Sequence, residues 1–405
     1  MRILVVSNLF PPVTTGGYEA ECGAVAEHLR ERHEVTVLTS IPPGGAVPPQ
    51  PGVLRELDLL SGDAAGARRA PRAALRASEV AGRLQALRPE LVYAWNCANI
   101  PQAGLRQLAD SGVPVAFRVC EHWFGGLFAR DQFMRELLPA GRGPARAAWA
   151  AGCRALNRLP QLRLDPLAPL RTAISWNSNA LERSVPTPAF LEPVLERVQH
   201  PVPPHGEVYE GVRRAPAPEP EIVFIGRVNR GKGLGVAIEA LARLRAGRAP
   251  HARLVVIGPE EQPDYAAEMR ALAARRGLDG AVTWRGQLGP EQAAAALAEA
   301  GAMIVPSTWE EPFGLVAIEG ALARVPVVAS DIGGIGEGLH DGEHALLFEP
   351  GDSAGAAAAL ERVLCEPEAT AARVERARAR AEAFRIGPYL AEQERFVLEA
   401  REALS

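Results

Sequence analysis

The stretch that decides the fold is Ile222-Val223-Phe224-Ile225, followed by Gly226-Arg227-Val228-Asn229-Arg230-Gly231-Lys232-Gly233. Apolar residues of high β propensity run directly into a glycine-rich loop, and a segment of helical period follows from Leu234. A strand, a loop at its carboxyl end and a helix form the repeating unit of a parallel sheet that helices cover on both faces. The stretch therefore predicts an α/β domain that binds a ligand at residues 226–233.

The same unit recurs along the whole chain. In the first half, short apolar runs predict strands at Ile3–Val6, Glu34–Leu38, Leu91–Ala94, Val115–Val119 and Thr172–Ser175. In the second half, they predict strands at Ile222–Ile225, Leu254–Ile257, Val282–Trp284, Met303–Val305, Val327–Ala329 and Leu346–Phe348. Segments of helical period separate these runs, so the sequence predicts two Rossmann-like, doubly wound α/β domains.

Proline marks the boundary between the two series. The segments His200–Gly206 and Ala215–Pro220 are rich in proline and unsuited to a central strand or a helix interior. At 405 residues, the chain also exceeds the roughly 250–300 residues that one hydrophobic core serves. We predict an N-terminal domain at residues 1–205, a C-terminal domain at 206–384, and a final helix within 385–405 that packs back on the first domain.

The composition is that of a soluble globular protein, with 47% hydrophobic and 23% charged residues. No apolar run approaches the roughly 18 residues that cross a bilayer, and the N-terminus has the pattern of a strand rather than of a signal peptide. The five cysteines form no C-x-x-C pair, which argues against structural zinc and a disulfide framework. We expect a cytoplasmic protein without a nucleic-acid partner.

Positive charge gathers in the first half, where 22 basic residues face 18 acidic ones up to residue 205. Two stretches are rich in arginine: Arg68, Arg69, Arg72 and Arg76, and the arginines within residues 142–163. Such stretches can hold a protein reversibly at an anionic membrane, although few apolar side chains accompany these arginines. The alternative is that arginine is the default solubilising residue of this chain. We expect at most weak, peripheral attachment to the inner membrane face.

Lys232 is the only lysine, whereas the other 43 basic residues are arginine. A chain that keeps a single lysine indicates a position that needs a compact ammonium group. Arg227 lies in the same loop, and two cations beside backbone amides at a helix start favour a diphosphate. The alternative is an exposed basic loop. The pattern G-x-x-x-x-G-K-[ST] is absent, so this is not the loop of a P-loop ATPase.

Two glutamates follow the predicted strand Met303–Val305. Glu311 lies in the loop before a predicted helix and Glu319 about two turns into that helix, roughly 9–12 Å along its axis. Carboxylates accept hydrogen bonds from sugar hydroxyls, so the pair suits a ligand with a hydroxyl-rich group at each end. The alternative is a surface acid and an ordinary helical glutamate. A glycine loop, Gly16-Gly17, follows the first strand and offers further backbone donors.

The order and spacing of these motifs resemble glycosyltransferase family 4, which comprises retaining enzymes of the GT-B fold with two Rossmann-like domains facing a central cleft. The resemblance covers most of the chain and rests on Gly226-Arg227 with Lys232-Gly233, Val305-Pro306-Ser307, Glu311 to Glu319, Pro326 to Asp331 with Gly333-Gly334 and Glu337, and Phe10-Pro11-Pro12 with Gly16-Gly17.

The resemblance implies a site for a nucleotide sugar. In it, Arg227 and Lys232 hold the donor diphosphate and Glu319 binds the ribose. Glu311 contacts the transferred sugar, and it is catalytic together with the two cations. Backbone amides at the donor site come from Phe313, Gly314, Leu315, Gly16 and Gly17. No D-x-D motif occurs, as expected of a mechanism without a metal.

The acceptor side departs from that family. Its members often place a histidine followed by aspartate after the strand equivalent to Val115–Val119, whereas this chain has Cys120-Glu121-His122. Glu121 and His122 are therefore the candidates on the acceptor side. The alternative for His122 is a loop histidine without a catalytic role. Arg324 also stands where the family usually has glycine.

We expect a metal-independent, retaining hexosyltransferase that moves a sugar from a nucleotide diphosphate, UDP above all, to a hydroxyl of a small molecule, glycan or lipid. No cofactor is expected besides this donor co-substrate. Two alternatives stay open: a UDP-sugar 2-epimerase of the same architecture, and a catalytically impaired protein that binds a nucleotide sugar.

Overall fold

The computed structural model describes residues 1–14, 16–42, 44, 47–60, 64–127, 144, 147, 151 and 169–405, with the backbone alone for 64–68, 70 and 71. The chain forms two compact units. Unit 1 comprises Met1–Asn177, Leu181–Gln199 and Gly387–Ser405, and unit 2 comprises Ser178–Ala180 and His200–Ile386. The arginines of residues 142–163 and the side chain of Arg68, which the sequence singled out as basic stretches, lie outside the described residues.

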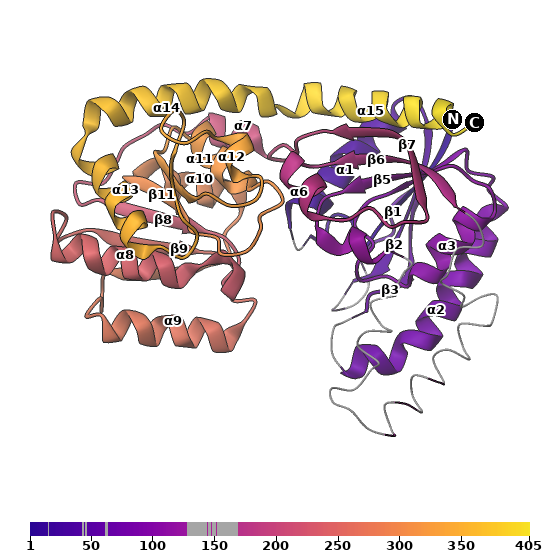
Figure 1. The fold of residues 1–405 in the computed structure, drawn as a ribbon, viewed down its shortest axis with the longest axis horizontal. Coiled ribbons are helices and arrows are strands. Elements are labelled where there is room, and N and C mark those ends of the chain that lie inside the picture. The colour runs from indigo at the N-terminus through magenta and orange to yellow at the C-terminus, as the bar shows by residue number, and fades with distance from the viewer. Residues whose placement is uncertain are drawn as a thin grey trace. The chain divides into compact units, whose positions relative to one another are not determined.

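Unit 1 contains a seven-stranded parallel sheet in the order β3-β2-β1-β4-β5-β6-β7 (Figure 1). The strands are β1 (Arg2–Ser7), β2 (Glu34–Ile41), β3 (Val53–Asp58), β4 (Leu91–Ala94), β5 (Val115–Val119), β6 (Leu170–Trp176) and β7 (Leu191–Val198). The helices are α1 (Gly17–Arg30), α2 (Ala64–Gln85), α3 (Gln102–Asp110), α6 (Asn179–Ser184) and α15 (Ile386–Ala403). The strand order reverses between β1 and β4, which makes this edge the expected ligand-binding position of such a sheet.

The final helix α15 is fixed to the sheet of unit 1 by buried polar contacts. The Tyr93 hydroxyl on β4 donates to Gln393 Oε1 at 2.6 Å. Arg118 on β5 is fully buried and pairs with Glu21 of α1 at 3.0 Å, and Glu21 also accepts from the Tyr389 hydroxyl. Because a buried charge without a partner is costly, these contacts hold α1 and α15 on the sheet together.

Unit 2 contains a six-stranded parallel sheet in the order β10-β9-β8-β11-β12-β13. The strands are β8 (Glu221–Ile225), β9 (Arg253–Ile257), β10 (Val282–Gly286), β11 (Ala302–Val305), β12 (Val327–Ser330) and β13 (Leu346–Phe348). The helices are α7 (Gly206–Glu210), α8 (Leu234–Ala246), α9 (Pro263–Arg275), α10 (Pro290–Glu299), α11 (Leu315–Leu322), α12 (Ile335–Gly338), α13 (Ser353–Cys365) and α14 (Pro367–Ala381).

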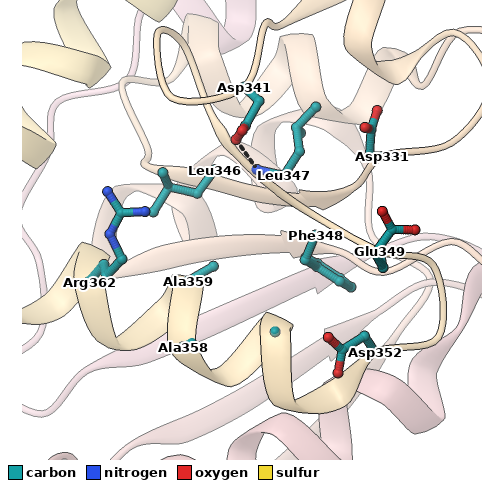
Figure 2. A pocket seen from close by; sticks show the side chains of 11 residues that line it. Asp331, Asp341, Leu346, Leu347, Phe348, Glu349, Asp352, Ala358, Ala359 and Arg362 are labelled. Carbon is teal, nitrogen blue, oxygen red and sulfur yellow. Dashed lines mark hydrogen bonds between the residues drawn. The ribbon is translucent and has the colours of Figure 1, made fainter.

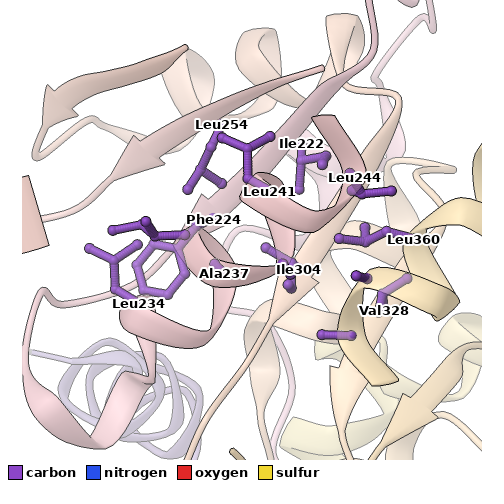
Figure 3. Close-up of a cluster of buried hydrophobic side chains, with 14 of the residues drawn as sticks. Ile222, Phe224, Leu234, Ala237, Leu241, Leu244, Leu254, Ile304, Val328 and Leu360 are labelled. Atoms are coloured by element: carbon purple, nitrogen blue, oxygen red, sulfur yellow. The ribbon is translucent and has the colours of Figure 1, made fainter. Parts of the chain in front are cut away.

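Helices cover both faces of this sheet. On one face α8 packs against α13 and α9, and on the other α11 packs against α7 and α14. Figure 3 shows the core under α8, where Leu234 and Leu241 meet Phe224 and Ile304 from the strands. These side chains are at most 2% exposed, so the loop of residues 226–233 continues from a rigid strand into a rigid helix.

The central strands lie where the apolar runs predict them, whereas β3 and β7 were not predicted. Both are edge strands of unit 1, so they need no continuous apolar run. The sequence of β7 contains Pro193 and three charged residues, which an edge strand tolerates and a central strand does not. Among the described residues, no helix is long and apolar enough to span a membrane.

Candidate functional site

An ion pair joins two loops at the carboxyl edge of the sheet in unit 2. The Lys232 Nζ atom lies 2.5 Å from Glu311 Oε1, and the Ser307 hydroxyl donates to the same oxygen at 2.5 Å. Lys232 follows β8, while Ser307 and Glu311 follow β11, the neighbouring strand. Glu311 is only 6% exposed, so these two partners offset the cost of burying its carboxylate. The structure thus brings together two of the residues that the sequence singled out.

Gly233 allows the two loops to approach. Its φ is +67°, and a Cβ atom there would lie 1.8 Å from the carbonyl oxygen of Pro306. The Thr308 amide also donates to the Gly231 carbonyl at 2.9 Å. Only glycine meets both the backbone conformation and the close approach, which explains why the lysine of this loop is followed by glycine.

A third loop, which follows β12, closes on Glu311 from the other side. The Gly334 amide donates to the Glu311 carbonyl at 2.8 Å. A Cβ atom on Gly333, whose φ is +59°, would lie 2.1 Å from that carbonyl oxygen. The ends of β8, β11 and β12 therefore converge on Glu311, and Gly333 and Gly334, which carry part of the resemblance, allow this approach.

Arg227 is held by a different carboxylate from Lys232. Its Nη1 atom lies 2.7 Å from Glu261 Oε1, in the loop between β9 and α9. Asn229 links Glu261 to the backbone of Lys232, because its side chain bonds Glu261 and also accepts from the Lys232 amide at 3.0 Å. Asn229 and Ser307 lie in the sequence motifs named above, but neither they nor Glu261 were assigned a role in the site. For Asn229 the sequence held one usable signal, because asparagine at the start of a helical turn is a common N-cap.

Glu319 lies on α11 and contacts a residue that the sequence did not single out. Its carboxyl group bonds the hydroxyl of Tyr209, which comes from α7. Dense surrounding protein raises the pKa of Glu319 to about 7, although the bond from Tyr209 lowers it in part. Its partly exposed side chain is therefore a weak acid that titrates near neutrality. The structure shows no contact between Glu319 and Glu311.

The Phe313-Gly314-Leu315 segment forms the start of α11. Gly314 precedes the helix with φ +85°, and Leu315 is its first residue, so amides at this end have no partner within the helix. The Phe313 side chain is 2% exposed and stacks on the ring of His200, with centroids 5.0 Å apart. The side chain of Phe313 therefore packs inside the unit, and only its backbone is placed to meet a ligand.

The predicted residues of unit 1 lie at the carboxyl ends of its central strands. Gly16 precedes α1 and donates its amide to Glu19 Oε2 at 2.8 Å, and Gly17 is the first residue of that helix. Glu121 follows β5 and accepts from Asn96 Nδ2 at 2.9 Å. Asn96 Oδ1 accepts in turn from Asn8 Nδ2 at 3.1 Å. This chain of amide and carboxylate groups crosses the point where the strand order reverses.

His122 does not continue the strand. It is the first residue of a 3₁₀ turn, His122–Gly126, so it does not share a strand face with Cys120. The Cys120 side chain is buried, and burial raises the pKa of its thiol above the usual range. The His122 Nε2 atom lies 3.4 Å from the Ser184 hydroxyl. The structure thus places His122 in a turn after β5, in contact with Ser184.

One group of described residues has the composition of a metal site. Potential ligand atoms of His340, Glu343 and His344 lie within 4.8 Å of one another, in the loop between α12 and β13. However, His344 Nδ1 accepts from the His340 amide at 3.2 Å. Burial lowers the pKa of His344, and the nearby Arg376 and Arg380 lower it further. These positive charges disfavour a cation, and the loop contains none of the predicted site residues.

A cavity of about 420 Å³ lies elsewhere in unit 2, beside β13 and α13 (Figure 2). Its polar lining comes from Asp331, Asp341, Glu349, Asp352 and Arg362. The carboxyl group of Asp341 accepts from the Leu347 amide at 2.8 Å. None of the residues predicted for catalysis or donor binding lines this cavity, and its negative charge does not suit a diphosphate.

The chain is similar in sequence to known glycosyltransferases. Residues 209–380 match the family model described as "Glycosyl transferases group 1". The chain is 29% identical over 410 residues to glycogen synthase of Mycobacterium tuberculosis, an alignment that covers 94% of this chain and 90% of that protein. It is 36% identical over 148 residues to D-inositol 3-phosphate glycosyltransferase of Acidothermus cellulolyticus, covering 35% and 33% of the two chains.

Solved structures match the whole chain. Sucrose-phosphate synthase of Thermosynechococcus elongatus aligns over 99% of both chains with a TM-score of 0.70 and 20% identity. Anabaena HepE, solved in complex with UDP and glucose, aligns over 98% of this chain and 100% of that one, with a TM-score of 0.69 and 19% identity. The chain has the GT-B fold. In this GT-B protein, Lys232, Ser307 and Glu311 all lie in unit 2, within the segment that matches the family model.

Proposed function

We propose that this protein is a retaining glycosyltransferase that transfers a hexose from a UDP-sugar to a hydroxyl group of a carbohydrate acceptor, without a metal ion. The observation that carries the proposal is the convergence of Lys232, Ser307 and Glu311 at the ends of β8 and β11. A partly buried cation, a buried carboxylate and the start of α11 together suit a diphosphate that is attached to a sugar.

The leaving group is stabilised by fixed positive charge in this proposal. Lys232 has three N–H donors and gives one to Glu311, so two remain for a phosphate oxygen. Arg227 has donors free in the same way beside Glu261. Two cations and the dipole of α11 would neutralise the departing UDP, the task that a metal performs in other transferases.

The remaining donor contacts follow from the geometry of α11. Glu319 and Tyr209 form a hydroxyl and carboxyl pair that suits the two ribose hydroxyls. Glu311 is then left to contact the sugar that is transferred. Amides at the start of α11 add further donors to the diphosphate, as anions favour such positions.

A carbohydrate acceptor is supported by two observations. The alignment with the M. tuberculosis protein named glycogen synthase covers both units, whereas that with the inositol phosphate enzyme covers about a third of the chain. In unit 1, the partly exposed Glu121, oriented by the buried Asn96, supplies a carboxylate, which binds hydroxyls well. We place the enzyme in the cytoplasm, with at most weak and salt-sensitive membrane attachment.

Acceptor dependence of donor consumption tests the proposal. Nucleotide sugars are first ranked by the thermal shift that they cause, and UDP release is then measured with and without maltooligosaccharides. We expect UDP release that depends on the acceptor. An epimerase would convert the UDP-sugar without any acceptor, and a binding protein would release no UDP, so either result would refute the proposal.

A further inference from the structure

We propose that Glu261 is a positioning residue that holds the phosphate-binding loop, residues 226–233, in its working conformation. The inference rests on the proposed function, in which Arg227 and Lys232 of this loop hold a diphosphate. Glu261 comes from a separate segment, the loop between β9 and α9, and is half-exposed. It has no place in the donor contacts described above.

The Glu261 carboxylate contacts Arg227 and Asn229 of the loop. Glu261 Oε1 accepts from Arg227 Nη1 at 2.7 Å, and Glu261 Oε2 accepts from Asn229 Nδ2 at 2.5 Å. Asn229 Oδ1 in turn accepts from the backbone amide of Lys232 at 3.0 Å. Glu261 therefore orients the side chain of the first cation directly and the backbone of the second through Asn229.

Neighbours of Glu261 support the same loop. The Val228 amide donates to the Pro259 carbonyl at 2.8 Å, and the Arg230 amide donates to Gln262 Oε1 at 3.1 Å. The Arg230 guanidinium also lies over the ring of Tyr265, 5.0 Å from its centroid. The segment 259–265 is thus a support for the loop, and Glu261 is its one carboxylate in contact with Arg227.

The contact with Glu261 leaves Arg227 with hydrogen-bond donors for a phosphate. A guanidinium has five N–H donors, and only Nη1 is used here. The remaining donors can meet phosphate oxygens while Glu261 fixes the orientation of the plane. Pre-organisation of this kind reduces the entropy lost on binding, so removal of Glu261 should weaken binding of a diphosphate.

The expected effect is modest because Arg227 and Glu261 are 36% and 41% exposed. Exposed ion pairs contribute little, so we expect Glu261→Ala to weaken UDP binding about fivefold. Glu261→Gln keeps one acceptor for Asn229 or Arg227 and should recover part of that loss. Uridine lacks phosphates, so its binding should not change in either variant.

The neighbouring acid supplies a matched control. Glu260 pairs with Arg270 and makes no contact with the loop of residues 226–233 in the described structure. The experiment compares wild type, Glu261→Ala, Glu261→Gln and Glu260→Ala. UDP affinity is measured by calorimetry, uridine affinity by ligand-observed NMR, and the melting temperature without ligand serves as a test of folding.

The expected pattern is a selective loss of UDP affinity in the Glu261 variants, smaller in Gln than in Ala, with Glu260→Ala like wild type. Unchanged UDP binding in Glu261→Ala would overturn the inference, since Glu261 would then have no effect on the loop. Tighter binding would overturn it as well, since Glu261 would then compete with the phosphate for Arg227. An equal loss of uridine affinity would overturn it too, because a general disturbance would then explain the result. Failure of wild type to bind UDP would instead refute the proposed function.

Discussion

Lys232 and Glu311, 79 residues apart in the chain, are joined by an ion pair of 2.5 Å between Nζ and Oε1. The residue predicted to bind phosphate and the residue predicted to bind the sugar therefore form an ion pair with each other in the protein without a donor. Glu311 is almost fully buried, and the ammonium group of Lys232 offsets the cost of burying its carboxylate.

Lys232 should be irreplaceable by arginine. Lys232→Ala removes a charge-assisted contact to the leaving group, and we expect kcat/KM to fall by about 10²–10³-fold, or about 2.7–4 kcal/mol. Lys232→Arg should recover little, because a planar guanidinium does not fit the position of a compact ammonium beside Glu311 and Ser307. Steady-state kinetics measures both, with Arg253→Ala as the control, since Arg253 pairs with an exposed Glu219. Near-normal activity of the arginine variant would refute the requirement for lysine.

Substitutions of Glu311 and Glu319 should have different effects on UDP binding measured by calorimetry. Glu319→Ala is expected to weaken the binding of free UDP, because the ribose is present in UDP. Glu311→Gln is expected to leave UDP binding nearly intact and to reduce transfer, because its partner sugar is absent from UDP. The opposite pattern would show that ribose and sugar are placed the wrong way round.

UDP binding should depend on pH through Glu319. Burial raises the pKa of this carboxyl from 4.5 to about 7, so the ligand-free protein carries the proton at pH 6 and has mostly lost it at pH 8. The ionised form accepts from both ribose hydroxyls, and UDP affinity is therefore expected to rise between pH 6 and 8. Calorimetry of wild type beside Glu319→Gln isolates the effect, since titration of UDP itself is common to both. Parallel pH profiles of the two proteins would contradict this role.

Gly233 should be required for the close approach of two loops. Gly233→Ala combines a positive φ with a clash against the Pro306 carbonyl, and we expect a loss of stability of at least about 1–3 kcal/mol together with weaker UDP binding. Gly277→Ala is the matched control, because its φ is +68° and nothing lies within 4 Å of the added Cβ. Thermal unfolding and UDP titration measure the difference. Equal losses in both variants would mean that backbone strain, not the approach to Pro306, is what matters.

The sequence was sufficient for the central strands and for the loops that follow them. Buried parallel strands such as Leu91–Ala94 and Val115–Val119 consist of a short, largely apolar run, which can be recognised in the sequence. The edge strands β3 and β7 lack such a run, which is why they went unpredicted. Arg324 shows a further limit: its φ of 55° lies in the region that favours glycine, so the family's usual glycine reflects the backbone and not the site.

For the site, the residue types could be predicted from the sequence, whereas the pairs that they form could not. Charge and glycine spacing pointed to Lys232 and Glu311, and the pair between them appears only when β8 and β11 are neighbours. Tyr209 comes from α7 and Glu261 from the loop after β9, and no local sequence pattern marks either of them as a site residue. The role of His122 stayed open from the sequence, and the structure shows that the chain turns into a 3₁₀ helix at that point.

The most direct test of the account is NMR analysis of the product formed from an α-linked UDP-sugar and a carbohydrate acceptor, with the Lys232→Ala variant measured beside wild type. We expect an α-glycoside that forms only when acceptor is present, equimolar with released UDP, and almost none with the variant. A β-glycoside, sugar conversion without acceptor, or equal product from Lys232→Ala would contradict the claim that this loop stabilises the leaving UDP of a retaining transfer.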